Sequence, residues 1–378
     1  MLREIHESKG RIVSKRRVVI GMSGGVDSSV AAALLVEQGY EVIGITIKTY
    51  NYEDVGGNVA NEKSCCSLDG INDARAVCAD LGIPHYVLDF SAPFRENVID
   101  MFVDEYLAGN TPNPCVICNR TIKWEELIRK GLGLGAEYVA MGHYARVGHD
   151  EESGRYWITR GEDAEKDQSY ALWALTQDSL ARTIFPLGEI SKSEARRVAE
   201  AHGVHTADKV ESQEICFIPD DDYKRFLRDN VDGLANRVKG GDVIFEGRKI
   251  GEHDGYPFYT IGQRRGLNVA VGEPVFVTEI RSGDNTIVVG RKEELLHRRF
   301  SVHSVSMQKY AFPTEPLRVH AKIRYKDSAA PATLIPQDDG SIIVEFDEPK
   351  HSITPGQSTV WYESADVVGG GIIQSILE

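Results

Sequence analysis

The sequence has few cysteines, no long apolar run and less positive than negative charge. Only 6 of the 378 residues are cysteine, which is too few for a secreted disulfide scaffold and fits a reducing compartment where some thiols react or bind metal. No hydrophobic run approaches the length of a membrane-spanning helix. The 43 Lys and Arg against 57 Asp and Glu give a net charge of -14, so any nucleic-acid binding requires a local basic surface.

The N-terminal stretch also has none of the features of a targeting signal. Residues Met1 to Arg17 are polar, include Glu4 and Glu7, and contain no apolar core of the kind that export signals carry. We therefore expect a tail at 1–17, a cytoplasmic protein, no membrane partner and a monomer. The chain contains neither an internal repeat nor a low-complexity segment.

One motif organises the first half of the chain. The run GMSGGVDSS begins at Gly21, directly after the apolar strand pattern of 18–20 and directly before a helical pattern at 30–35. Glycines that turn tightly into a helix N-terminus form a phosphate site, because the first N–H groups of the helix have no internal partner. Asp27 is a carboxylate among phosphate donors, which suits a Mg²⁺ ion bridging it to the phosphates. The pattern is neither GxxxxGKS, whose Lys is missing here, nor GxGxxG.

The order of strand and helix patterns predicts the fold class. Strand and helix patterns alternate from residue 18 to about 143, which favours an α/β domain built on a parallel sheet with helices on both faces. Beyond about residue 219, alternating strands separated by Gly, Asp and Pro turns predict β-rich structure that closes into small barrels. We expect an N-terminal tail, a parallel-sheet catalytic domain at 18–218, a small central β-rich domain at 219–295 and a C-terminal β-barrel at 296–378.

The six cysteines fall into four groups. Cys115 and Cys118 form a C-x₂-C pair in TPNPCVICN, where two prolines predict a loop up to Cys118 and a helix from about Asn119. A thiol at a helix N-terminus has a lowered pKa, which favours the thiolate. A C-x₂-C pair alone indicates zinc, a redox pair or iron–sulfur ligands, and no second pair follows at zinc-finger spacing. Cys216 lies between polar and apolar runs, Cys78 belongs to the apolar side of a helix, and we expect Cys65 and Cys66 to be inert.

These residues carry a resemblance. GMSGGVDSS resembles the PP-loop of the ATP pyrophosphatase superfamily, which splits ATP between the α and β phosphates. Together with TPNPCVICN at Thr111, MGHYA at Met141, KDQSY at Lys166, ESQEICFIP at Glu211, YTIGQRRGL at Tyr259, KIRY at Lys322 and TPGQ at Thr354, it resembles the tRNA-specific 2-thiouridylase family from about Val18 to the C-terminus.

The resemblance implies a role for individual residues. It implies Cys118 as the nucleophile, Cys216 as the persulfide-bearing cysteine and Asp27 as a catalytic and Mg²⁺-binding residue. It implies ATP contacts at Gly21, Met22, Ser23, Gly24, Gly25, Val26, Asp27, Ser28, Ile47 and Gly142. Contacts to the target base are implied at Asn113, Pro114 and Cys115, and contacts to tRNA at His143, Lys166, Asp167, Gln168, Arg324, Tyr325 and Gln357.

The activity implied is 2-thiolation of the wobble uridine of tRNA. ATP would adenylate the uridine O2, and sulfur from a donor such as a persulfide relay protein or sulfide would then displace AMP. In one departure, this chain has Cys115 where the family pattern has Asp. Two routes therefore stay open: a persulfide route that ends in a disulfide between Cys118 and Cys216, and a route in which Cys115, Cys118 and Cys216 hold a [4Fe–4S] cluster.

Two other functions compete with this reading. A PP-loop ligase of the amidotransferase type acting on a small molecule would need a glutaminase or ammonia channel, and no motif for either is present. A non-catalytic RNA-binding module with a vestigial ATP loop does not fit the intact Ser23, Gly24, Gly25, Asp27 and Ser28. Single contact residues such as His143 and Arg324 could also have purely structural roles.

Overall fold

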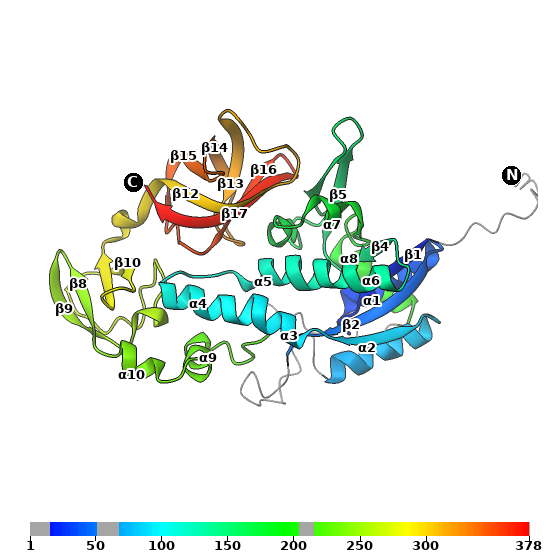
Figure 1. Ribbon diagram of the computed structural model, residues 1–378, viewed down its shortest axis with the longest axis horizontal. Coiled ribbons are helices and arrows are strands. Elements are labelled where there is room, and N and C mark those ends of the chain that lie inside the picture. The colour runs from blue at the N-terminus through cyan, green and yellow to red at the C-terminus, as the bar shows by residue number, and fades with distance from the viewer. Residues whose placement is uncertain (1–15, 51–67, 204–214, 378) are drawn as a thin grey trace, which may run out of the picture.

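The chain forms a parallel-sheet domain followed by two β-rich domains (Figure 1). The computed structural model describes residues 16–50, 68–203 and 215–377. Cys65 and Cys66 lie outside these residues, as does most of the N-terminal tail. Within the described residues, no helix combines the length and hydrophobicity that crossing a membrane requires.

The first domain contains a five-stranded sheet in the order β3-β2-β1-β4-β7, with every pairing parallel. Its strands are β1 Arg17–Gly21, β2 Glu41–Lys48, β3 His85–Asp89, β4 Tyr138–Ala140 and β7 Thr183–Ile184. Because β2 and β4 flank β1, the direction of the strand order reverses at β1. In parallel sheets this is where ligands bind, at the carboxyl ends of the strands.

Both faces of this sheet are buried, as a parallel sheet requires. Val18 and Ile20 point to one face and pack with α1 and α8, whereas Val19 points to the other face and packs with Trp124 and Leu127. The helices of the domain are α1 Val26–Glu37, α2 Leu68–Asp80, α3 Ser91–Phe94, α4 Asp100–Ala108, α5 Pro114–Ile117, α6 Leu127–Gly133, α7 Gln177–Ala181 and α8 Lys192–Ala201, together with the π-helices η2 Arg95–Ile99 and η3 Cys118–Glu126 and the 3₁₀ turn η4 Ser169–Leu172. Cys78 of α2 is fully buried, and its burial raises the pKa of the thiol to about 11, as the apolar helix face predicts.

A hairpin and the helix α8 complete the first domain. The hairpin consists of β5 Ala145–Asp150 and β6 Arg155–Arg160, and it lies between the parallel sheet and the C-terminal barrel (Figure 1). At the start of α8 the Ser191 hydroxyl accepts a hydrogen bond from the Glu194 N–H at 3.2 Å, which is the N-cap that the spacing of the two residues predicts. The apolar residues at 169–175 predict a helix, but the structure forms only the 3₁₀ turn η4 there.

The middle domain is a four-stranded sheet in the order β10-β11-β8-β9. Its elements are α9 Tyr223–Asn230, α10 Leu234–Val238, β8 Gly241–Phe245, β9 Arg248–His253, η5 Tyr256–Phe258, β10 Phe276–Arg281, β11 Thr286–Gly290 and η6 Lys292–Leu295. Its core is continuous with that of the first domain, since Phe217 and Phe226 pack against Phe102 of α4.

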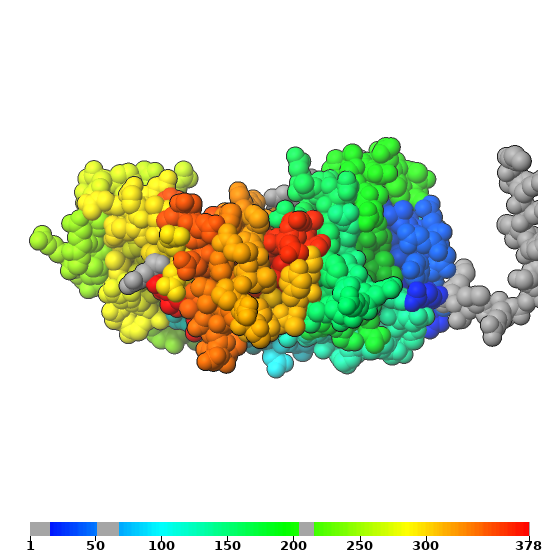
Figure 2. Space-filling view, turned by 90° about the horizontal axis from the view of Figure 1, so that it is seen from above, coloured from blue at the N-terminus to red at the C-terminus, as the bar shows by residue number. Residues whose placement is uncertain are grey.

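The C-terminal domain is a closed six-stranded barrel. Its strands are β12 Leu296–Met307, β13 Leu317–Lys322, β14 Ala330–Pro336, β15 Ile342–His351, β16 Ser358–Glu363 and β17 Asp366–Ile376. Pairing of β12 with both β15 and β17 closes the ring, which removes the sheet edges. The barrel lies between the middle domain and the first domain (Figure 2). These observations confirm the fold class predicted from the sequence.

Candidate active site

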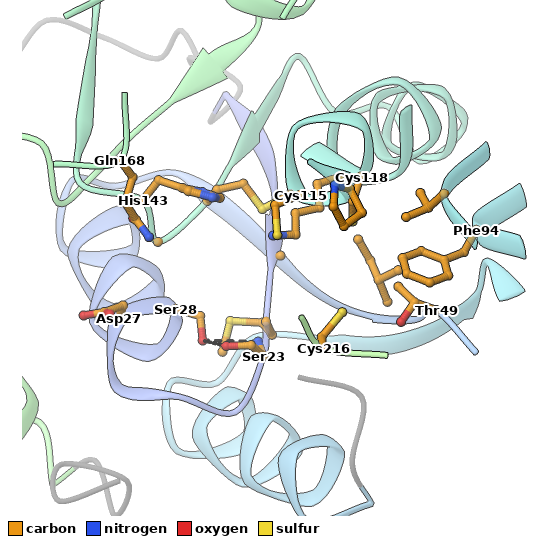
Figure 3. Close-up of a pocket in the computed structure, with 18 of the residues that line it drawn as sticks. Ser23, Asp27, Ser28, Thr49, Phe94, Cys115, Cys118, His143, Gln168 and Cys216 are labelled. Atoms are coloured by element: carbon orange, nitrogen blue, oxygen red, sulfur yellow. Dashed lines mark hydrogen bonds between the residues drawn. The ribbon is translucent and has the colours of Figure 1, made fainter. Parts of the chain in front are cut away.

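A cavity of about 340 Å³ opens at the carboxyl end of the parallel sheet (Figure 3). Residues from the loop after β1, from β2, from α5 and η3, from the segment after β4 and from the segment around Cys216 converge on it. Its lining is Gly21, Met22, Ser23, Asp27, Ser28, Ile45, Ile47, Thr49, Phe94, Val98, Pro114, Cys115, Cys118, Lys123, Met141, Gly142, His143, Gln168, Ile215, Cys216 and Phe217.

The PP-loop forms one side of this cavity. The backbone N–H of Ser23 donates to the Ser28 hydroxyl at 3.2 Å, and the Ser28 hydroxyl donates to the Gly25 carbonyl at 3.1 Å, so the loop closes onto the first turn of α1. Gly24 has a φ of +71°, and a Cβ there would lie 2.2 Å from the Gly70 carbonyl oxygen, so both conformation and space require glycine. The positive end of the α1 dipole therefore faces the cavity, which suits an anion.

The Asp27 carboxylate is held by two partners. Lys192 Nζ donates to Asp27 Oδ1 at 2.8 Å and to Oδ2 at 2.9 Å, and the Tyr144 hydroxyl donates to Oδ1 at 2.8 Å. The Lys192 side chain is 10% exposed and that of Asp27 is 29% exposed. In Figure 3 the carboxylate of Asp27 points away from Cys115 and Cys216.

The end of β4 approaches the PP-loop closely. A Cβ at Gly142 would lie 2.8 Å from the Asp27 carbonyl carbon and 2.8 Å from the Ser28 nitrogen, so only glycine lets the two segments meet. The contact brings Met141, Gly142 and His143 to the cavity.

The C-x₂-C segment is helical earlier than its prolines suggest, which corrects the sequence prediction. The helix α5 begins at Pro114, at a position where proline needs no N–H donor and its fixed φ fits the helix. Cys115 is therefore in the first turn and is exposed, whereas Cys118 is buried and starts the π-helix η3. The expectation that Cys118 sits at a helix N-terminus is wrong.

Cys216 faces the same cavity from a different part of the chain. The Tyr50 hydroxyl donates to the Cys216 carbonyl oxygen at 2.8 Å, and the Phe217 ring packs edge-on against Phe94 at 5.7 Å and Phe102 at 5.4 Å. These contacts anchor the backbone on either side of the thiol, which is half-buried. The fold thus brings Cys115, Cys118 and Cys216 to the lining of the cavity that the PP-loop also lines (Figure 3).

His143 is held as a neutral ring. Trp124 and Phe185 pack around the imidazole at centroid distances of 5.5 and 6.2 Å. Burial, with a smaller contribution from the positive charge of Lys123, lowers the pKa of His143 to about 3. Its buried Nδ1 has no hydrogen-bond partner within the described part of the chain. The ring therefore presents a neutral polar edge at the cavity.

The C-terminal barrel holds the loop that precedes Cys115. The Gln357 side-chain amide donates to the Thr111 carbonyl at 2.8 Å, and the Thr111 N–H donates to the Pro355 carbonyl at 2.9 Å. Nearby, the Tyr325 hydroxyl donates to the Asp167 carbonyl at 3.3 Å. Arg324 donates to the Ser352 carbonyl.

The predicted site residues divide into two sets. Most of the residues expected to bind ATP, the base or tRNA line the cavity. The following expected residues do not line it: Gly24, Gly25, Val26, Asn113, Lys166, Asp167, Arg324, Tyr325 and Gln357. Sequence reasoning missed Thr49 and Phe94 as lining residues, and it placed Lys123 on a basic tRNA-binding face and not in the cavity. The clue for Lys123 was its position five residues after Cys118, which becomes informative only if that segment is not a regular α-helix.

Protein-family models match all three domains of the chain. Residues 16–220 match a family described as the tRNA methyl transferase HUP domain, 229–291 a tRNA methyl transferase PRC-barrel domain, and 297–373 an aminomethyltransferase β-barrel domain. Among solved structures, an NMN synthetase from Francisella tularensis aligns at 17% identity and a TM-score of 0.32, covering 53% of this chain and 67% of that chain, which is too weak a likeness to bear on the site.

Curated relatives cover nearly the full length. The tRNA-specific 2-thiouridylase MnmA of Salinibacter ruber is 52% identical over 364 residues, covering 96% of this chain and 95% of the relative. The tRNA-specific 2-thiouridylase MnmA of Amoebophilus asiaticus is 50% identical over 367 residues, covering 96% of each chain. The chain therefore belongs to the tRNA-specific 2-thiouridylase family.

Proposed function

We propose that this protein catalyses the ATP-dependent 2-thiolation of the wobble uridine of tRNA, as an ATP-dependent tRNA-uridine 2-sulfurtransferase. The observation that carries the proposal is that Cys118 and Cys216, far apart in the sequence, line the same cavity as the PP-loop. The family membership supports the substrate and the reaction class. An activating site for phosphates and a pair of thiols in one cavity are what a two-step thiolation requires.

In the first step the uridine O2 attacks the α-phosphorus of ATP. The bond between the α-phosphorus and the bridging oxygen breaks, pyrophosphate leaves and O2 becomes adenylated. Gly21 to Ser28 hold the phosphates through backbone N–H groups and serine hydroxyls at the positive end of α1. Ile47 and Gly142 line the adenosine side. The purpose of the step is chemical, since AMP is a far better leaving group than the oxygen of a carbonyl.

Mg²⁺ accompanies ATP in this proposal, but Asp27 in its present arrangement does not fit a magnesium ligand. Both of its oxygens already accept hydrogen bonds from Lys192, and Tyr144 donates to one of them. No three His, Cys, Asp or Glu side chains within the described residues are grouped as a metal site. We therefore derive no step through an Asp27-bound ion and assign Asp27 to ATP turnover through its contact with Lys192.

In the second step a persulfide on Cys216 delivers the sulfur. The terminal sulfur attacks C2 of the adenylated uridine, the C2–O2 bond breaks, and AMP leaves with that oxygen. The Cys118 thiolate then attacks the Cys216 sulfur and breaks its bond to the transferred sulfur, which stays on C2 as the thiocarbonyl. The products are 2-thiouridine and a Cys118–Cys216 disulfide, which a dithiol reductant must reduce before a new persulfide is loaded.

The alternative route places a [4Fe–4S] cluster on Cys115, Cys118 and Cys216. The three thiols line one cavity, and the described residues contain no group of three His, Cys, Asp or Glu side chains arranged around a metal position. We derive no step through a cluster. Cys115→Ala separates the routes: an active, iron-free variant supports the persulfide route, whereas loss of both activity and bound iron from anaerobically prepared protein supports the cluster.

The tRNA is the macromolecular substrate in this proposal. The target base lies against Asn113, Pro114 and Cys115 after leaving the anticodon-loop stack, as chemistry on a base requires. The remaining contacts to tRNA are assigned to His143, Lys166, Asp167, Gln168, Arg324, Tyr325 and Gln357. Tyr325 and Gln357 of the barrel donate to carbonyls of Asp167 and Thr111 in the first domain, which supports contacts to tRNA from both domains. A persulfide relay protein or sulfide supplies the sulfur, and we propose that a monomer works in the cytoplasm.

Nucleoside analysis tests the function directly. Bulk tRNA from cells that lack the protein should contain no 2-thiouridine derivatives at the wobble position when analysed by mass spectrometry. A plasmid copy of the gene should restore them, and a copy carrying Cys118→Ser should not. Unchanged 2-thiouridine in the deletion strain would refute the proposal.

A further inference from the structure

The cavity contains one cationic side chain whose role is unassigned. Among the lining residues in the described part of the chain, Lys123 is the only Lys or Arg. The other polar lining groups are hydroxyls, thiols, the Gln168 amide, the imidazole of His143 and the carboxylate of Asp27, which faces Lys192. The lining of the proposed phosphate-binding cavity therefore contains one ammonium group, that of Lys123, although the loop itself lacks a P-loop lysine.

The π-helix η3 explains how Lys123 reaches the cavity. Cys118 is the first residue of η3 and Lys123 is the sixth. In an α-helix two residues five apart differ by about 140° around the axis, so they would point in different directions. The i→i+5 hydrogen bonding of a π-helix returns the fifth residue to nearly the same face. Both side chains line the cavity, as this geometry requires.

Neighbouring residues fix the environment of η3. Ile122 and Trp124, on either side of Lys123, are fully buried, and the Trp124 indole N–H donates to the Thr183 hydroxyl at 2.7 Å. Thr121 donates to the Ile117 carbonyl at 2.8 Å. The backbone that carries Lys123 is thus anchored on both sides. The positive charge lies close enough to His143 to help keep that ring neutral.

The proposed reaction creates a charge in this cavity that calls for a cation. While AMP is bonded to the uridine O2, its phosphate carries one negative charge. When the sulfur attacks C2 and the C2–O2 bond breaks, the electron pair leaves with O2 and the phosphate becomes a dianion. A charge that appears during the reaction is best stabilised by a preorganised cation in a site shielded from water.

We propose that Lys123 is a further catalytic residue, whose ammonium binds the phosphate of the adenylated uridine and stabilises AMP as it departs. The inference rests on the proposed thiolation. In this proposal the PP-loop binds the pyrophosphate released in the first step. Lys123 acts in the second step, from the helix face that also carries Cys118.

Single-turnover measurements of the two half-reactions test the role. The full chain is mixed with ATP, Mg²⁺, unmodified tRNA and a persulfide donor, and pyrophosphate, AMP and 2-thiouridine are followed over time. Lys123→Met should release pyrophosphate at close to the parental rate but release AMP about a hundredfold more slowly. Adenylated tRNA should accumulate and be detectable by mass spectrometry of the nucleosides. Lys123→Arg should recover part of the AMP release, because it retains the charge.

Lys130→Met is the matched control, because Lys130 is an exposed lysine on the adjoining α6. It should behave as the parent in both half-reactions. Parental AMP release by Lys123→Met would overturn the inference. So would a raised KM for tRNA with unchanged kcat, since this would make Lys123 a contact to the tRNA backbone. If the parent itself forms no 2-thiouridine, the proposed function fails instead.

Discussion

Both carboxylate oxygens of Asp27 accept hydrogen bonds from the ammonium of Lys192, at 2.8 and 2.9 Å. The two residues come from opposite ends of the first domain's sequence and meet where α1 and α8 both begin. The pair links the PP-loop to the last helix of the domain. Its low exposure makes it sensitive to the loss of either partner.

Lys192→Met should destabilise the protein by about 2 kcal/mol, since it leaves the Asp27 carboxylate part-buried with the Tyr144 hydroxyl as its remaining partner among the described residues. Urea unfolding measures the change. Adding Asp27→Asn should recover part of the stability but no ATP turnover. Arg299→Met, which removes the exposed ion pair with Glu345, is the control and should cost less than about 1 kcal/mol. Equal losses for Lys192→Met and Arg299→Met would contradict the special role of the part-buried pair.

ATP should be cleaved to AMP and pyrophosphate, and only in the presence of tRNA. The position of cleavage follows from the loop, which resembles a PP-loop and lacks the P-loop lysine. The need for tRNA follows from the proposed first step, in which the uridine O2 is the attacking group. Chromatography of the nucleotides after incubation with tRNA measures the products. Release of ADP and phosphate would show that the loop has been assigned to the wrong class.

The neutral state of His143 should appear in the pH dependence of stability. The folded pKa is about 3, below the ordinary value of 6.5, so between these values the unfolded chain binds a proton that the folded chain does not. The free energy of unfolding should therefore fall as the pH drops from 6.5 towards 3. His143→Gln should make this fall shallower. The same slope in parent and variant would mean that the ring takes up a proton in the folded protein.

The barrel should position the loop before Cys115 through Gly356. This residue has a φ of +88°, and an added Cβ would lie 2.9 Å from Asn110 Cβ and 2.9 Å from the Thr111 nitrogen. Gly356→Ala should cost about 3 kcal/mol and lower thiolation, because it adds a backbone clash to the strain of positive φ. Gly340 has a φ of +80°, but a Cβ added there would have no atom within 4 Å. Gly340→Ala therefore adds the strain of positive φ without a clash, and it should cost about 1 kcal/mol and leave activity unchanged. Equal effects of the two variants would show that the barrel does not hold the loop.

Local patterns predicted the parts of the protein that local forces determine. The apolar runs around Val19 and Ile45, with a glycine turn and helix signal after the first, predicted β1, the PP-loop and α1, because burial of strands on both sheet faces leaves a readable pattern. Ser191 predicted the start of α8 through its capping side chain. The turn-rich second half predicted barrels.

Three features of the site could not be predicted from local patterns. The start of α5 at Pro114 was missed, because a proline that breaks a helix interior is also the residue that best begins one. The place of Lys123 in the cavity was missed, because sequence periodicity is read at 3.6 residues per turn and a π-helix changes which residues share a face. The presence of Cys216 in the same cavity as Cys118 depends on the aromatic packing of Phe217 with Phe94 and Phe102, residues that no short window of sequence contains together.

The most direct test is reconstituted thiolation with site-resolved cysteine variants. The purified chain, ATP, Mg²⁺, unmodified tRNA and a persulfide donor are combined, and the tRNA nucleosides and released pyrophosphate are quantified. The account predicts 2-thiouridine at the wobble position with the parent, and pyrophosphate release without 2-thiouridine for both Cys118→Ser and Cys216→Ser. Thiolation at the parental rate by either variant would contradict the assignment of the two thiols to sulfur transfer.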